Sequence, residues 1–353
     1  MTRGDQRLAT AVVALTAIAG AARYVGGVPA VVAFTLAGVA LASQAWLISN
    51  ATEQVGRRLG PAITGTLQAT VGNLPEFFVV LFALRAGEQT VAQTAVLGSI
   101  FSNALLVLGL VLVTGSLVAS DQVMRFSPRL PNDATTLLLV SSFLIVLLAL
   151  IGSSHNVAAI HTRTISIIGA GVILVVYLAW MRQYIRGGGD AGEGSADAAT
   201  APSLAVGVAT LVLAGVASAL TSDWFIHSLQ PTIHQLHISQ AFAGLVIVAI
   251  AGNAVEHAVG IVLASRGESE LAIAVVKTSV AQIAAFLYPL LVLVSLTTAT
   301  QLTFTMPAVY VGALIGTALI VWQITGDGEA TPFEGVALVA VFVVIATIAW
   351  FEH

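Results

Sequence analysis

Long apolar stretches follow one another along almost the whole chain, and this pattern leaves few folds open. The 353 residues are 58% hydrophobic and only 8% charged. A helix needs about 20 consecutive apolar residues to cross a bilayer. Backbone polar groups in lipid must be satisfied within the spanning structure, which favours helices. We therefore predict an all-α polytopic membrane protein.

The apolar stretches are spaced so that about eleven transmembrane helices fit. Arg3 and Arg7 precede the first one without an evident cleavage site, so this helix is expected to be retained. An odd number fits one extra N-terminal helix, 1–23, and two five-helix repeats, 24–186 and 203–353. The predicted spans lie near 8–23, 28–49, 61–84, 91–118, 134–152, 164–184, 203–223, 240–265, 270–297, 304–323 and 332–351.

The linker 187–202 is rich in Gly, Ala and Asp and is too polar to cross the membrane. With the N-terminus inside, nine arginines fall on the cytoplasmic side and three outside, as the positive-inside rule favours. The N-terminus and the linker are therefore predicted to be cytoplasmic. Five helices per half would insert the second half upside down, the inverted-repeat plan of many secondary transporters. Compact loops and no obvious targeting segment favour a prokaryotic plasma membrane.

Two glutamates lie inside the apolar stretches, and each closes the pattern Gly-Asn-x-x-Glu. The copies are Gly72–Glu76 and Gly252–Glu256, 180 residues apart. The same offset aligns further pairs without a gap, including Gly87 with Gly267 and Ser99 with Ser279. A carboxylate inside a membrane is costly and rarely persists without a task. The repeat therefore predicts one cation site built from two halves.

The residues around each glutamate suit a hard cation. Pro75 has no N–H and Gly72 adds backbone freedom, so we expect a broken helix with free carbonyls beside Glu76. Val255 replaces the proline in the second copy, where the break would depend on glycine alone. Carboxylate, amide and carbonyl oxygens are what Ca²⁺ prefers. The predicted ligands are Glu76, Glu256, Asn73, Asn253, Gly72 and Gly252.

The next helix of each half carries further polar residues. We predict that they support the site, although small polar residues also let membrane helices pack closely. They are Ser99, Ser102, Asn103, Ser279 and Gln282. Burial favours a protonated carboxyl, whereas a bound divalent cation favours the carboxylate. Glu76 and Glu256 could therefore exchange protons for a cation, and His257 could relay protons or serve as a hydrogen-bonded structural residue.

Lys277 is an uncertain modulator of this site. It lies well inside a predicted span, just before Ser279. It could reach back to the cytoplasmic interface. It could instead place an internal positive charge near Glu256, which would oppose divalent binding and indicate weak calcium affinity, another ion or altered stoichiometry.

The two windows resemble the alpha repeats of the calcium/proton exchanger (cation/proton exchanger) family within the calcium/cation antiporter superfamily. They are GNLPEFFVVLFALRAGEQTVAQTAVLGSIFSNALLVLG, residues 72–109, and GNAVEHAVGIVLASRGESELAIAVVKTSVAQIAAFLYP, residues 252–289. The resemblance implies ten core helices plus one extra, alternating access, and two glutamates shared between Ca²⁺ and H⁺. It also implies export of cytosolic Ca²⁺ in exchange for protons, with no cofactor. Thr278 and Gln230 depart from the family pattern.

Other function classes fit less well. A sodium/calcium exchanger or an antiporter for another cation stays open, and a passive channel is a further alternative. We do not expect an enzyme, because no metal-protease histidine pattern occurs and the chain has no cysteine. No basic cluster points to nucleic acid. The predicted partners are Ca²⁺, H⁺ and the lipid bilayer.

Overall fold

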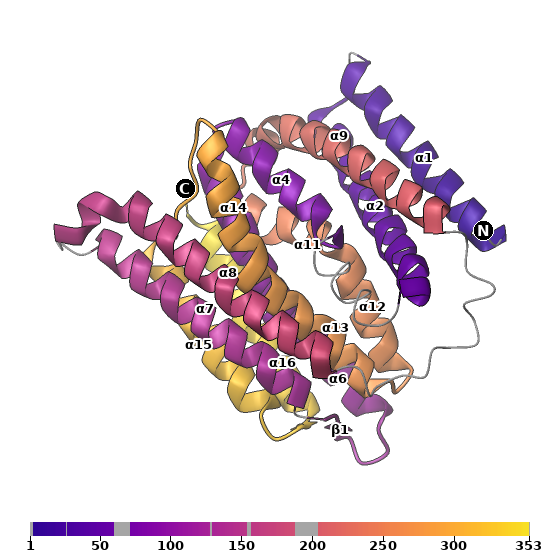
Figure 1. Ribbon diagram of the computed structural model, residues 1–353. Helices are drawn as coiled ribbons and strands as arrows, with labels where there is room; N and C mark the ends of the chain where they lie inside the picture. The colour runs from indigo at the N-terminus through magenta and orange to yellow at the C-terminus, as the bar shows by residue number, and fades with distance from the viewer. Residues whose placement is uncertain are drawn as a thin grey trace. The chain divides into compact units, whose positions relative to one another are not determined.

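The computed structural model describes residues 3–25, 27–59, 71–127, 129–153, 157–187 and 204–352. These residues are almost entirely helical, with one two-stranded antiparallel sheet (Figure 1). The α-helices are α1 Arg3–Tyr24, α2 Ala30–Leu59, α4 Leu74–Arg85, α5 Gln89–Phe101, α6 Leu108–Val118, α7 Arg129–Ser153, α8 Thr162–Gly187, α9 Leu204–Leu236, α10 Gln240–Phe242, α11 Ala249–Gly252, α12 Ala254–Ser265, α13 Ser269–Gln282, α14 Tyr288–Val294, α15 Ala308–Thr325 and α16 Pro332–Trp350. The π-helical segments are η1 Ser102–Val107, η5 Ala243–Val248 and η6 Ile283–Leu287. The short 3-10 helices are η2 Val157–His161 and η7 Ser295–Thr297, and the strands are β1 Met124–Arg125 and β2 Glu329–Ala330.

The helices confirm the prediction of an all-α membrane protein. Among the described residues, eight helices are long and apolar enough to cross a membrane. The pair Gln240–Gly252 and Ala254–Ser265 is also long and apolar enough, but it is bent by 62°, as in a broken span or a re-entrant loop. The helix Leu8–Tyr24 is apolar but shorter. The predicted span 61–84 and the linker 187–202 lie partly outside the described residues, so the count of eleven helices stays a prediction.

Helix α9 continues well past the predicted end of its span at residue 223. It ends at Leu236, and its 33 residues make it about 50 Å long at 1.5 Å per residue. The hydrocarbon core of a bilayer is only about 30 Å thick. The helix therefore extends beyond the predicted span 203–223. Leaving the apolar environment does not end a helix when its backbone hydrogen bonds can continue.

The contacts between helices divide the chain into two compact units, each described by itself below. Unit 1 comprises Met1–Ala86, Leu178–Ile238 and Ala251–Val255. Unit 2 comprises Gly87–Tyr177, Ser239–Ile250 and Glu256–His353. Each unit therefore combines segments from both predicted repeats, and the predicted division at the linker stays a prediction.

Unit 1 is built around α2 and α9, with α1 and α4 packed against them. The rings of Phe34 and Phe225 stack at 4.3 Å between centroids. The buried Gln44 on α2 connects three helices, because its Nε2 donates 2.8 Å hydrogen bonds to Oγ1 of Thr16 on α1 and of Thr221 on α9. The extra N-terminal helix is thus fastened to the unit by a polar contact inside an apolar interface.

Unit 2 surrounds α5, η1 and α6, where nearly every residue from Thr94 to Leu112 is buried. Helix α16 packs on α6, and α7 packs on α13 and α15. Glycines allow backbones to touch: a Cβ on Gly335 of α16 would lie 2.5 Å from the carbonyl oxygen of Gly109 on α6. The hydrophobic effect does not drive helix association in lipid. Small residues at such crossings instead allow the close van der Waals packing that holds membrane helices together.

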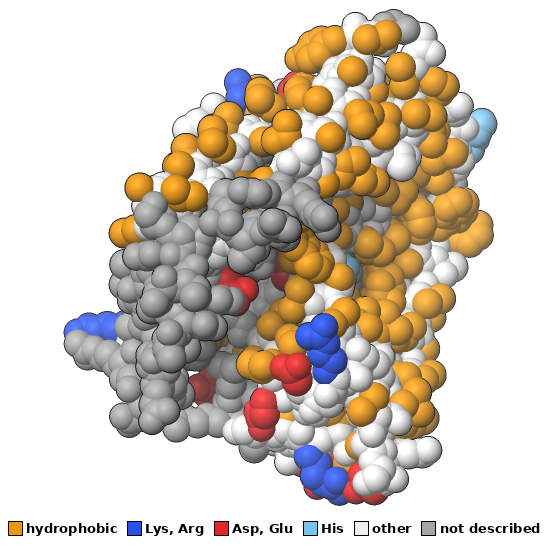
Figure 2. Space-filling view, turned by 90° about the vertical axis from the view of Figure 1, so that its right-hand side faces the viewer, with side chains coloured by type: hydrophobic (Ala, Val, Ile, Leu, Met, Phe, Trp, Pro, Cys, Tyr) orange, Lys and Arg blue, Asp and Glu red, His pale blue; other side chains and the backbone are white. Residues whose placement is uncertain are grey.

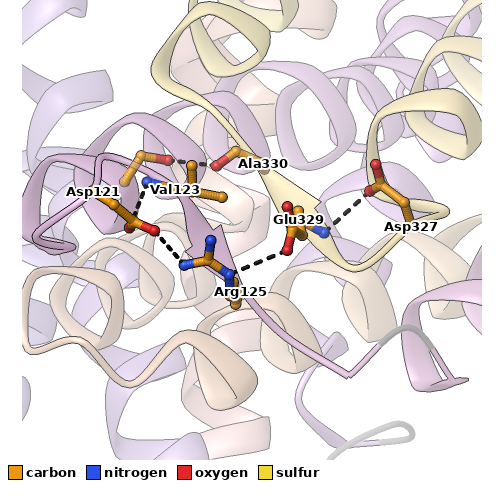
Figure 3. A network of polar contacts seen from close by, with 7 residues as sticks. Asp121, Val123, Arg125, Asp327, Glu329 and Ala330 are labelled. Carbon is orange, nitrogen blue, oxygen red and sulfur yellow. Dashed lines mark hydrogen bonds and ion pairs between the residues drawn. The ribbon is translucent and has the colours of Figure 1, made fainter.

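The strands β1 and β2 form a polar clasp between the α6–α7 and α15–α16 connections of unit 2 (Figure 3). Arg125 donates to Asp121 at 2.7 Å and to Glu329 at 3.1 Å. The guanidinium lowers the pKa of the Asp121 carboxyl from its ordinary value by hydrogen bonding to the charged form. About half of each side chain is exposed, so this ion pair contributes little to stability.

The described parts of the two repeats share their element boundaries at the offset of 180. Helix α4 covers 74–85 and α12 covers 254–265, while α5 begins at 89 and α13 at 269. The turns before the second helices also match, with φ of 83° at Gly87 and 75° at Gly267. A positive φ favours glycine, which explains why this glycine occurs in both copies.

The face drawn in Figure 2 is covered widely by hydrophobic side chains, and its few charged residues gather mostly in its lower part. Exposed apolar residues follow a helical stripe on α9, where Val212, Val216 and Leu220 are 53–60% exposed. Such a surface suits lipid rather than water.

The crossing of α5 with η5 gives a test of the packing in unit 2. A Cβ on Gly98 would collide with the backbone of Leu245, whereas one on Gly171 of α8 would meet nothing within 4 Å. Gly98→Ala should therefore destabilise the purified protein by about 1–3 kcal/mol, the cost of overpacking a close contact. Gly171→Ala should leave the melting temperature unchanged or slightly raise it. Equal melting temperatures for both variants in detergent would contradict the described crossing.

Candidate ion-binding site

Both Gly-Asn-x-x-Glu motifs lie at a break between helices. In the first, Gly72 and Asn73 form a turn and α4 begins at Leu74. In the second, α11 ends at Gly252, Asn253 is not helical and α12 begins at Ala254. Both predicted breaks are present. Irregular backbone at membrane depth is tolerated only in a protein interior or beside a cavity.

A proline is not required for a break at this motif. Pro75 lies in the first turn of α4, where a missing N–H costs nothing because those N–H groups have no partner within the helix. The second copy has Val255 at the equivalent position and still bends by 62°. The shared cause is therefore the Gly-Asn pair.

Each glutamate lies in the first turn of the helix that follows its break. The N-terminal end of a helix carries a partial positive charge and stabilises a nearby carboxylate. Asn73 is the N-cap residue of α4, because its carbonyl accepts a 2.9 Å hydrogen bond from the N–H of Phe77. The fold thus supports a charged carboxyl at a depth where isolated charges are costly.

Unit 1 brings the two copies of the motif together. A Cβ on Gly252 would lie 3.6 Å from Cβ and 3.8 Å from Cγ of Glu76. The neighbouring side chains are buried, with Asn73 6%, Glu76 3% and Asn253 1% exposed. The Nδ2 atom of Asn73 has no hydrogen-bond partner among the described residues. Five of the six predicted ligands thus belong to unit 1: Gly72, Asn73, Glu76, Gly252 and Asn253.

The sixth predicted ligand, Glu256, belongs to unit 2 and is partly exposed. One turn later on the same face of α12 lies Gly260. A Cβ there would meet Val276 of α13 at 2.8 Å, Val111 of α6 at 3.4 Å and Val107 of η1 at 3.8 Å. The Glu256 face of α12 is therefore directed toward the polar helices that follow the two motifs. The neighbouring His257 is buried, and its Nε2 has no hydrogen-bond partner within the described part of the chain.

The predicted supporting residues lie on these polar helices of unit 2. Helix α13 packs against η1, and α5 packs against η6. The carbonyl of Ser99 accepts hydrogen bonds from Nδ2 of Asn103 at 2.9 Å and from Oγ of Ser102 at 3.4 Å. Ser279 and Gln282 are buried on the opposite helix, and Oγ of Ser279 has no partner among the residues described. The site roles of these residues stay predictions.

A π-helical segment adjoins each of these polar stretches. Segment η1 begins at Ser102, and η6 begins directly after Gln282. Segment η5 ends directly before the first residue of α11. A π-helix contains wider turns than an α-helix and often occurs at functional sites. The sequence analysis did not predict these segments, because no residue type marks a π-helix. At the offset of 180, η1 and η6 end at equivalent residues and begin one residue apart, and this agreement between the two repeats points to a purpose.

The ammonium of Lys277 is held inside unit 2. It donates hydrogen bonds to Oγ1 of Thr135 on α7 and, at 2.7 Å, to Oγ1 of Thr325 on α15. Lys277 is 2% exposed and does not reach the protein surface. Two residues along a helix correspond to a rotation of about 200°, so Lys277 and Ser279 lie on opposite faces of α13. Sequence reasoning missed the two threonines, because hydroxyls distant in sequence carry no pattern.

No cluster of three or more His, Cys, Asp or Glu residues that could hold a metal occurs among the described residues. A cation at the motifs would need amide and carbonyl oxygens besides the carboxyls. Such a mixed, mostly neutral ligand set suits an ion that is bound and released rather than one that stays.

The comparison with known proteins places this arrangement in a family. The sodium/calcium exchanger protein family matches residues 29–182 and 206–351, which together make up most of the chain. The chain belongs to the sodium/calcium exchanger protein family. Both motifs lie inside the matched segments, and the matched segments are separated by the linker region.

Individual relatives of this family member are similar over nearly their full length. The Ca²⁺/H⁺ antiporter ChaA of Bacillus subtilis (strain 168) is 30% identical over 328 residues, covering 90% of this chain and 92% of the relative. The solved structure of native YfkE has 26% identity and a TM-score of 0.80, covering 98% and 99% of the two chains. The sodium-calcium exchanger NCX_Mj shares the fold at a TM-score of 0.57 and 20% identity. The resemblance to calcium/proton exchangers is confirmed.

The space between Gly252 and Glu76 gives a test of the motif contact. Gly252→Ala should be tolerated, because its Cβ would make an ordinary van der Waals contact with Glu76. Gly252→Leu should displace the Glu76 side chain and weaken cation binding about tenfold or more, as expected for a binding loss of about 1.4 kcal/mol. The measurement is ⁴⁵Ca²⁺ binding to the purified variants. Similar affinities for Gly252→Leu and Gly252→Ala would show that this contact does not shape the site.

Proposed function

We propose that this protein is a secondary active antiporter that exchanges cytosolic Ca²⁺ for protons by alternating access. Glu76 and Glu256 would bind either Ca²⁺ or protons. The observation that carries the proposal is the pair of Gly-Asn breaks, each followed by a glutamate in the first turn of a helix. The names of the relatives support the choice of ions, since ChaA and YfkE are described as Ca²⁺/H⁺ antiporters.

The chemistry of exchange follows from competition for the same charges. Two carboxylates are neutralised either by one Ca²⁺ or by two protons, so both occupied forms carry the same charge through the membrane. An empty site would expose two buried negative charges, which is costly in a low-dielectric environment. Moving an occupied site is therefore cheaper than moving an empty one, and this difference favours exchange over leak.

Asn73, Asn253 and the carbonyls of Gly72 and Gly252 would complete the coordination of the ion. Ca²⁺ takes six to eight oxygen ligands, which two carboxylates cannot supply alone. The supporting residues Ser99, Ser102, Asn103, Ser279 and Gln282 would orient these groups or hold waters. His257 would pass protons to and from Glu256, its neighbour in sequence.

The two repeats would be inverted relative to each other, with the N-terminus and the linker 187–202 in the cytoplasm. The equal element boundaries of α4 with α12 and of α5 with α13 support a duplication. The bias of the arginines supports the orientation. A prokaryotic plasma membrane would be the location, and Ca²⁺ would leave the cell.

The proposal is tested in proteoliposomes with an imposed pH gradient and no sodium. The gradient should drive Ca²⁺ uptake against its concentration in the unaltered protein. Glu76→Gln and Glu256→Gln should each lose more than about 99% of this uptake, because a neutral amide can neither take up a proton nor supply a negative charge. Glu334→Gln, which alters the capping box of α16, is the control for a general effect of removing a carboxylate.

Retained uptake in both glutamine variants would overturn the assignment of the site. Uptake that begins only when a sodium gradient replaces the pH gradient would support sodium/calcium exchange, the alternative that the family name favours. Calcium that equilibrates without accumulating would indicate a channel.

Lys277 is expected to tune this transport. Its amino group is held by two neutral hydroxyls, and no ion-pair partner for it is found in the part of the chain that the structure describes. Lys277→Met should therefore lower the KM for Ca²⁺ by about threefold or more, because removing a positive charge in a low dielectric favours cation binding.

The matched control is Thr325→Val, which removes one hydrogen bond and keeps the charge. It should lower the melting temperature and leave the KM for Ca²⁺ unchanged. An unchanged KM in Lys277→Met, with normal folding, would limit Lys277 to a structural role.

A further inference from the structure

A cavity lies in unit 1, between α1, the α1–α2 connection, α2 and α9. Its volume is about 250 Å³. It is lined by Ala19, Ala22, Arg23, Val25, Gly27, Val28, Ala30, Ala33, Trp224, His227, Ser228 and Pro231. None of the predicted ion ligands contributes to it, so it requires an explanation of its own.

The polar groups of this cavity suit an anion. Arg23 lies in the last turn of α1, and its Nε atom is buried without a hydrogen-bond partner among the described residues. His227 on α9 supplies a ring N–H, and Ala30 and Ala33 belong to the first turns of α2, whose N-terminal N–H groups favour negative charge. A guanidinium with an unused donor is the preferred partner of a phosphate.

No carboxylate lines this cavity, although Asp223 precedes His227 by one turn of α9. Asp223 is exposed and forms no ion pair with Arg23 among the described residues. Among the described residues, the contact found for the Arg23 guanidinium is the ring of Tyr24, whose centroid lies 5.4 Å from Cζ. The positive charge is therefore not neutralised by this part of the protein.

Much of the remaining wall is apolar, which points to a ligand with a hydrocarbon part. Alanines and valines from α1, the connection and α2 make up half of the lining residues. Tyr24 and Trp224 stand next to each other, with ring centroids 6.2 Å apart. Tyrosine and tryptophan gather at the level of the lipid headgroups. The cavity is also smaller than the 300–1,000 Å³ or so of sites that enclose a whole drug-sized molecule.

We infer that this cavity binds the phosphate of an anionic phospholipid, with Arg23 and His227 as donors and the acyl chains left in the surrounding bilayer. The lipid would join α1 to α2 and α9 at one end, as Gln44 joins the same three helices within the membrane. This inference does not depend on which ions the protein transports. Its basis is the cavity, the unneutralised arginine and the apolar walls.

The test uses the purified full-length protein in detergent and measures its melting temperature with added lipid. Phosphatidylglycerol should raise the melting temperature by several degrees, and phosphatidylcholine and inorganic phosphate should do so much less. Arg23→Gln should lose the specific effect of phosphatidylglycerol. Arg163→Gln, which removes an exposed arginine of α8, should keep it.

Two results would overturn the inference. One is an equal effect of phosphatidylglycerol on the unaltered protein and on Arg23→Gln. The other is an equal effect of inorganic phosphate, which would make the site one for free phosphate. If Arg23→Gln does not fold, Ala33→Leu replaces it as the test variant, because the larger side chain fills the cavity and the arginine is kept. The specific effect of phosphatidylglycerol should disappear in that variant too, and its persistence would contradict the inference.

Discussion

The cost of leaving polar backbone unsatisfied in a membrane is the constraint on which this structure depends. Nearly all of the described chain meets it with helices. The two Gly-Asn pairs lie among the non-helical residues, and they leave carbonyl and amide groups without helical partners. In a protein interior, such groups are oxygens that a cation could use. The glutamate in the following turn then benefits from the N-terminal end of its helix.

Close backbone contact makes this burial possible. Within unit 2, Gly98 lies against Leu245, and Gly109 faces Gly335. The wider turns of the π-helical segments η1 and η6 follow directly on these tightly packed stretches.

The sequence predicted the helical fold and the position of both breaks well, because each depends on local residue types. Apolar runs indicate spans, and a glycine beside an asparagine within such a run is conspicuous. The extent of α9 was missed, since a helix that leaves the apolar region shows no compositional signal where it ends. The contact of Gly252 with Glu76 could be anticipated only from the repeat, which placed the two motifs in one site. The hydroxyl partners of Lys277 and the bridge made by Gln44 could not be found, because they join residues 28 to 177 positions apart.

The duplication explains the backbone more completely than the side chains. Lys277 stands at the position equivalent to Leu97, a fully buried apolar residue of α5. Both helices start at equivalent residues and run into a π-helical segment. The fold therefore does not require a polar group at this position, and an ammonium there needs partners that a leucine does not. Thr135 and Thr325 supply hydrogen bonds but no opposite charge. Lys277 is present in one half only, so the two halves differ chemically even though their backbones match.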